Sequence, residues 1–112
     1  DQLIPMHCIV VYPAPAKIAN LNFIKTLQGL FPDYPIGFSD HTEGANIPAI
    51  AVSAGAKLIE KHFVRSKKDK GPDVSASMNP HELESLIEAS KTIFEAKILK
   101  ANPWFSRCNI SG

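Results

Sequence analysis

The sequence predicts an α/β fold built on a parallel sheet. Three short apolar segments alternate with three segments of helical character, in the order β-α-β-α-β-α, without an internal repeat or a linker. The first apolar segment is a continuous run, which is typical of a strand buried on both faces in a parallel sheet. Strands that alternate with helices in this way predict parallel neighbours joined by right-handed crossovers.

The first half of the chain is expected to contain two strands and one helix. Leu3 to Tyr12 is nearly all apolar and rich in Ile and Val, which predicts the first strand. Residues 20–31 carry apolar side chains at helical spacing, with Asn20 as the expected N-cap and Pro32 as the stop signal. Residues 36–39 form the second expected strand.

A second helix, rich in small residues, is expected over residues 45–54. Pro48 lies in its first turn and Gly55 follows its last turn, which are the positions that these two residues favour at helix ends. Lys57 to Val64 then predicts the third strand.

The last helix carries the clearest start signal in the chain. Asn79 is the expected cap, Pro80 takes the first helical position and Glu82 stands at the capping-box position. We therefore expect one domain over residues 1–101 and an irregular tail over residues 102–112.

Three parallel strands cannot close a barrel, and they leave two bare sheet edges. The pattern is compatible with a small open α/β layer or with three of the eight units of a (β/α)8 barrel. The order of the elements does not separate these two architectures.

Composition places the chain among globular proteins, with 45% hydrophobic and 21% charged residues. A formal net charge of +1 gives no signal for nucleic acid or membrane binding. We expect no membrane span and no signal peptide. Cys8 lies in an apolar run and is interpreted as a small core residue, while Cys108 lies in the polar tail. Two such cysteines do not suggest a disulfide framework, and a cytoplasmic location is expected.

The ends of the second and third expected strands carry the chemistry-bearing residues. Ser39 and His41 lie two positions apart on one strand, and Glu60 and His62 lie two positions apart on the next. Because side chains alternate along a strand, each pair shares a face, and two imidazoles on neighbouring strands can converge on one ion. Mn, Fe, Co and Zn all accept neutral imidazole. The alternative is that each histidine is a hydrogen-bonded core or capping residue.

Four further positions have weaker signals. Tyr12 ends the first strand at the same rim, either as a packing aromatic or as a ligand contact, and Asp73 follows a long loop as a turn residue or a mobile carboxylate. We expect His7 to be a hydrogen-bonded core residue and His81 to be exposed. The basic segment 61–70 is either a solvated loop or a positive field for an anionic substrate.

Several blocks resemble the sialic acid (N-acetylneuraminate) synthase family, in order and spacing from Pro5 to about Lys97. The most specific are the Ser-Asp-His-Thr block at residues 39–42 and the Glu-Lys-His-Phe block at residues 60–63. Further matches are Met-His-Cys, Tyr-Pro-Ala-Pro, Gly-Pro-Asp and Ser-Met-Asn-Pro. The resemblance implies that the chain corresponds to strands six to eight of a (β/α)8 barrel.

The resemblance also implies an activity and its residues. Members of the family condense phosphoenolpyruvate with an N-acetylmannosamine-type aldose, giving a nine-carbon 2-keto sugar acid and phosphate with the help of a divalent ion, typically Mn. In this sequence, the metal ligands would be His41 and His62, and Ser39 would contact the phosphate of phosphoenolpyruvate. Tyr12 and Asp73 would contact the amino sugar. The acidic residue beside the reacting centre, a candidate catalytic residue, would be Glu60.

The chain also departs from the family pattern. Ile9-Val10-Val11 replaces more polar residues before Tyr-Pro, and the family's phosphate-binding lysines and small C-terminal domain have no counterpart here. We therefore expect these residues alone to have little or no synthase activity, and to form a homo-oligomer or to associate with the missing barrel half. The alternatives are a non-catalytic half-barrel module and another metal-dependent aldolase or isomerase barrel. The aldose and the metal stay open.

Overall fold

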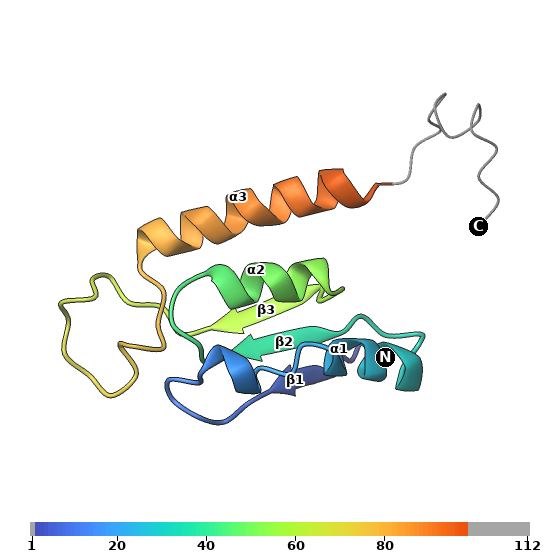
Figure 1. Ribbon diagram of the computed structural model, residues 1–112, viewed down its shortest axis with the longest axis horizontal. Coiled ribbons are helices and arrows are strands. Elements are labelled where there is room, and N and C mark those ends of the chain that lie inside the picture. The colour runs from blue at the N-terminus through green and yellow to red at the C-terminus, as the bar shows by residue number, and fades with distance from the viewer. Residues whose placement is uncertain (1, 99–112) are drawn as a thin grey trace.

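A three-stranded parallel sheet organises the chain, in a computed structural model that describes residues 2–98 (Figure 1). The strands, in spatial order, are β1 (Met6–Cys8), β2 (Gly37–Asp40) and β3 (Leu58–Lys61). The helices are the short 3-10 helix η1 (Ala16–Ile18) and the α-helices α1 (Phe23–Leu30), α2 (Asn46–Ser53) and α3 (Pro80–Lys97). The predicted α/β class and the order β-α-β-α-β-α are confirmed.

The sheet has one covered face and one open face. His7, Phe38 and Ile59 lie side by side in the register of the three strands, on the face that the helices cover. Phe38 is buried at the centre of this layer, against a core of side chains from α1, α2 and the adjoining strand ends: Ile24, Leu27, Ile36, Ala51 and Ala56. The opposite face carries the residues that alternate with these, and it is the face on which the candidate site lies.

The first strand is much shorter than predicted. Only Met6–Cys8 pairs with β2, and Leu3 and Val10 are 62% and 73% exposed, so burial on both faces is wrong. The ladder ends at Cys8 because the next carbonyl group, that of Ile9, accepts a hydrogen bond from the His41 side chain instead of a strand neighbour. The interpretation of Cys8 as a core residue is also wrong, since its side chain is exposed on the open face.

The first helix begins later than predicted. Asn20 is not the cap; it adopts a left-handed conformation with φ 47°, which asparagine tolerates better than most residues. Asn22 occupies the N-cap position without a side-chain hydrogen bond. The two buried residues of the helix, Ile24 and Leu27, belong to the apolar spacing that predicted this helix.

The ends of α2 and α3 follow the sequence signals. Pro48 lies in the first turn of α2, and Gly55 follows its end with φ 116°, a conformation that favours glycine. At the start of α3, Asn79 accepts a hydrogen bond from the Glu82 amide at 2.8 Å, and the Glu82 carboxylate accepts one from the Asn79 amide at 3.1 Å. The predicted capping box is confirmed.

The third strand is followed by a long loop whose last residues pair with its first residues. Phe63 forms an isolated parallel bridge with Met78, and the Met78 amide donates to the His62 carbonyl group at 2.8 Å. This loop lies at the left of Figure 1, where all three strands end. Every helix within residues 2–98 is too short or too polar to span a bilayer. The predicted tail at 102–112, with Cys108, lies outside the described residues.

Candidate functional site

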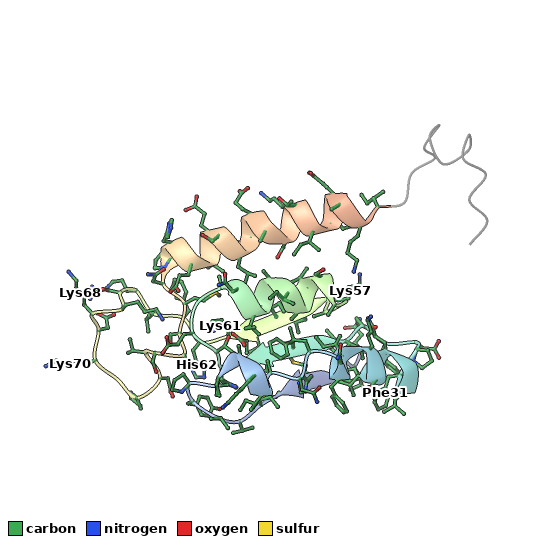
Figure 2. The ribbon with its side chains drawn as sticks, in the orientation of Figure 1. Phe31, Lys57, Lys61, His62, Lys68 and Lys70 are labelled. Carbon is green, nitrogen blue, oxygen red and sulfur yellow. The ribbon has the colours of Figure 1, made fainter. Side chains whose placement is uncertain are left out.

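The candidate site is a hollow of about 360 Å³ at the carboxyl end of β2 and β3, lined by Ser39, His41, Glu60, Lys61 and His62. Four of these five are residues that the sequence singled out. The register of the strands explains why they meet: Ser39 is directly opposite Glu60, and the two histidines follow two positions later on each strand. Figure 2 shows His62 at this end of the molecule, close to Lys61.

His41 is buried, with 7% of its surface exposed, and its orientation is fixed by a hydrogen bond. Its Nδ1 atom lies 2.9 Å from the Ile9 carbonyl oxygen, with the Cys8 sulfur at 4.0 Å on the same side. Because a carbonyl oxygen can only accept, Nδ1 carries the proton, and the Nε2 lone pair is left free to bind a ligand. A backbone partner on the other ring nitrogen is the usual companion of a metal-binding histidine.

His62 completes the pair across the hollow. Its ring centre lies 5.5 Å from that of His41, and its side chain is 41% exposed. Two imidazoles that share one ion, with about 2.1 Å between each nitrogen and the metal, have ring centres roughly 5 Å apart. The separation of the two rings is therefore compatible with one shared divalent ion that keeps open coordination positions. Within residues 2–98, no cluster of three or more His, Cys, Asp or Glu side chains has the arrangement of a metal site.

Ser39 and Glu60 are joined directly across the two strands. The Ser39 hydroxyl donates to a Glu60 carboxylate oxygen at 2.7 Å, while Ser39 is 6% exposed and Glu60 lies open to solvent. In this arrangement the hydroxyl proton is used by Glu60, so Ser39 can donate to an incoming anion only after its O–H rotates. The pair forms a polar floor beside the histidines.

Tyr12 lies against both histidines from the end of the segment that follows β1. Its ring centre is 4.2 Å from that of His41 and 5.9 Å from that of His62, with edge-on geometry in both cases. Tyr12 is 46% exposed, so its ring packs against the histidines and still faces solvent. The structure thus brings Tyr12 to the rim where the sequence placed it.

Asp73 approaches the site from the long loop. One of its carboxylate oxygens lies 4.0 Å from His62 Nδ1, and both side chains are about half exposed, at 47% and 41%. The loop that carries Asp73 is held by Lys67, whose ammonium group donates to the backbone carbonyls of Val74 and Ser77. All six residues singled out for chemistry therefore lie at one end of the sheet.

The basic segment 61–70 is not a uniform positive field. Lys61 is buried beside Asp40, Arg65 pairs with Asp69 at 3.3 Å, and Lys67 lies 3.6 Å from a Glu82 oxygen. Lys68 and Lys70 are exposed on the outer part of the loop (Figure 2). Most of the positive charge is locally compensated, which favours the solvated-loop interpretation.

Sequence reasoning missed a buried ion pair next to this site. Asp40 and Lys61 are directly opposite each other in the β2–β3 register, and each immediately precedes one of the two histidines. The available signal was this pair of opposite charges at equivalent positions of the two motif blocks. Outside the site, His7 donates from Nε2 to the Ala19 carbonyl at 2.8 Å and is 6% exposed, and His81 is exposed, as predicted.

Comparison with known proteins agrees with the resemblance. The chain is 46% identical over 99 residues to the spore coat polysaccharide biosynthesis protein SpsE of Bacillus subtilis, covering 87% of this chain and 26% of that protein. It is 44% identical over 89 residues to the N,N'-diacetyllegionaminic acid synthase of Legionella pneumophila, covering 80% and 25%. The solved structure of N-acetylneuraminic acid (sialic acid) synthetase from Leptospira borgpetersenii, in complex with citrate, matches with a TM-score of 0.84 at 34% identity, over 95% of this chain and 38% of that one.

The chain thus spans about a quarter of the length of the curated relatives it matches. The model of the NeuB family matches residues 1–100, which include every strand, every helix and both histidine blocks described above. The predicted resemblance is confirmed: the chain belongs to the NeuB family.

Proposed function

We propose that this chain is part of a sialic-acid-type synthase, which condenses phosphoenolpyruvate with an N-acetylmannosamine-type aldose to a nine-carbon 2-keto sugar acid and phosphate. The observation that carries the proposal is the convergence of His41 and His62, with ring centres 5.5 Å apart, in a hollow shared with Ser39 and Glu60. Relatives named as synthases of different nine-carbon sugar acids support the reaction class and leave the aldose open.

His41 and His62 would hold a divalent ion, which we propose to be Mn. Bound there, such an ion supplies Lewis-acid polarisation of a carbonyl oxygen. The protein's contribution to this site is the fixed orientation of His41, whose Nδ1–H is held by the Ile9 carbonyl at 2.9 Å. The edge-on ring of Tyr12 packs against both histidines on one side.

Glu60 is the proposed group that handles a proton. Its carboxylate is exposed to the hollow and accepts a hydrogen bond from Ser39, which fixes the position of one oxygen and leaves the other for a water molecule. A carboxylate so placed can orient and deprotonate the water that adds to C2 of the cation formed when C3 of phosphoenolpyruvate attacks the aldehyde, after which phosphate leaves C2. The O–H of Ser39, when it rotates away from Glu60, can donate to a phosphate oxygen.

The amino sugar would lie between Tyr12 and Asp73. Tyr12 offers a phenol and an apolar ring face, while Asp73 offers carboxylate oxygens that accept from sugar hydroxyl or amide groups. The 4.0 Å separation of Asp73 from His62 puts this pair of contacts next to the proposed metal position.

We also propose that β1, β2 and β3 correspond to strands six to eight of a (β/α)8 barrel. Among the described residues, the outer edges of β1 and β3 have no strand partner, and the histidines lie at the carboxyl ends of parallel strands, where barrel active sites lie. The open face of the sheet would then be the barrel interior. The chain would reach this closed form by pairing with further barrel strands or by forming a homo-oligomer.

Calorimetric titration of the chain with MnCl₂ tests the metal site. We expect one site in the parent chain, at least tenfold weaker binding in His41→Ala and His62→Ala, and unchanged binding in His81→Ala, a matched change at an exposed histidine on α3. Equal binding by the parent and both site variants would refute the proposed ligands.

Phosphate release from phosphoenolpyruvate tests the reaction. We expect the isolated chain with Mn and N-acetylmannosamine to release little or none, because the chain corresponds to about a quarter of a relative's length. A longer polypeptide that contains this chain should release phosphate only when both substrates are present. Aldose-dependent product without phosphate release would instead favour an aldolase or isomerase.

A further inference from the structure

The helix-covered face of the sheet carries a buried charge network directly behind the proposed metal site. The Lys61 ammonium lies 2.6 Å from an Asp40 carboxylate oxygen, and the two side chains are 1% and 0% exposed. The Thr42 hydroxyl lies 2.9 Å from both oxygens of the same carboxylate, to one of which it donates. Within the described residues, no buried side-chain N or O atom lacks a partner, so the network is complete.

The Lys61 ammonium contacts the residues on both sides of His41 in the sequence. Besides Asp40, the ammonium donates to the carbonyl group of Thr42, so one cation binds the residue before His41 and the residue after it. Lys61 itself is the residue before His62. A single side chain on one strand therefore connects to the two residues that flank His41 on the neighbouring strand.

This connection stands where the backbone ladder ends. Asp40 and Lys61 form the last residue pair in the β2–β3 register, so backbone pairing does not extend to the two histidines. On the open face, the preceding pair is joined by the Ser39–Glu60 hydrogen bond. The two strands are thus linked by side chains at successive positions on opposite faces, and the charged link is the nearer one to the histidines.

Stability alone is a weak explanation for a charge pair in this place. Desolvation of two ions offsets most of their attraction, and apolar pairs of similar volume are often as stable. A buried ionic network does fix geometry, because its partners tolerate little displacement before a charge is left unpaired. We propose that Asp40 and Lys61 are positioning residues that set the separation and orientation of His41 and His62. This inference rests on the proposed metal role of those histidines.

The test compares Asp40→Asn/Lys61→Met with the parent, using MnCl₂ alone as the probe. This double variant removes both charges. The Asn side-chain oxygen can still accept from the Thr42 hydroxyl, and Met retains the unbranched apolar part of the lysine side chain. We expect it to fold, by circular dichroism, and to bind Mn at least tenfold more weakly by calorimetry. We also expect a changed low-temperature electron paramagnetic resonance spectrum of the bound Mn at saturation, which a change in fold stability alone would not produce.

The matched control is Arg65→Met/Asp69→Asn, which removes an exposed ion pair from the following loop with the same change in charge. Its Mn affinity should stay within twofold of the parent. A folded Asp40→Asn/Lys61→Met variant with the parent's affinity and spectrum overturns the inference.

If that double variant does not fold, Thr42→Val tests the positioning role instead. It is nearly isosteric, suits a site that is 4% exposed and removes the hydroxyl that orients the Asp40 carboxylate. We expect this variant to bind Mn at least about threefold more weakly than the parent, and an affinity equal to the parent's overturns the inference. His41→Ala is included throughout. If it binds Mn as the parent does, the proposed metal site fails and the positioning role with it. If it loses binding while the network variants do not, only the positioning role fails.

Discussion

Removing one charge of the buried Asp40–Lys61 pair should lower the free energy of unfolding far more than removing both. Lys61→Met leaves the Asp40 carboxylate at 0% exposure with Thr42 as its remaining hydrogen-bond donor. Asp40→Asn leaves the Lys61 ammonium buried against neutral oxygens. Removing one partner of a buried pair costs about 3–5 kcal/mol, since the other charge is neither solvated nor neutralised. This is a large part of the ~5–15 kcal/mol that stabilises a typical domain.

The double variant Asp40→Asn/Lys61→Met should lose only about 1–2 kcal/mol. No charge is left buried, and the group that loses its donor is the Thr42 carbonyl, which otherwise accepts from Lys61. The expected signature is a double variant that is more stable than either single variant. Additive costs, by contrast, would make it the least stable of the three.

Urea denaturation followed by circular dichroism measures the difference. With an m-value of about 1.5 kcal/mol/M, each single variant should shift the midpoint down by about 2–3 M, and the double variant by roughly 1 M. Additive losses in the double variant, or single-variant losses below about 1 kcal/mol, would show that the pair is not energetically coupled as its burial implies.

Three further predictions concern the scaffold, each measured by urea denaturation. Asn79→Ala should cost about 1 kcal/mol because it removes the capping box, whereas Asn22→Ala, at a cap without a side-chain hydrogen bond, should cost less than half as much; equal costs would contradict the capping role. Gly55→Ala should destabilise, since φ is 116° and a Cβ would clash with the Gln28 side chain of α1. Gly29→Ala, with nothing within 4 Å, should stabilise by roughly 0.5–1 kcal/mol. Phe38→Ala should cost about 3–5 kcal/mol at 2% exposure, and a loss below 1 kcal/mol would mean that it is not a core residue.

Local signals in the sequence were sufficient where short-range geometry decides the structure. The capping box of α3 depends on residues three positions apart, and Gly55 ends α2 through its own backbone conformation. The Ser-x-His and Glu-x-His spacings place each pair on one face of its strand, because side chains alternate along an extended chain. These rules require no knowledge of what packs against the segment.

Local signals failed where a distant partner intervened. The apolar run from Leu3 to Tyr12 has the composition of a long strand, but the ring of His41 binds the Ile9 carbonyl and ends the pairing at Cys8. Cys8 lies in an apolar run and is nevertheless exposed, because its face of the sheet is open within the described residues. Composition cannot reveal which face of a strand the helices cover.

The sequence by itself determined the α/β class, the order of the elements and the two histidine blocks. The tertiary structure decided that the histidines converge, with ring centres 5.5 Å apart, and that Asp40 and Lys61 meet behind them. The physical reason is the register of β2 and β3: residues 21 positions apart in the chain become direct neighbours. A shift of β3 by one residue would move Lys61 to the open face and His62 to the covered face, so that neither would meet its partner on β2.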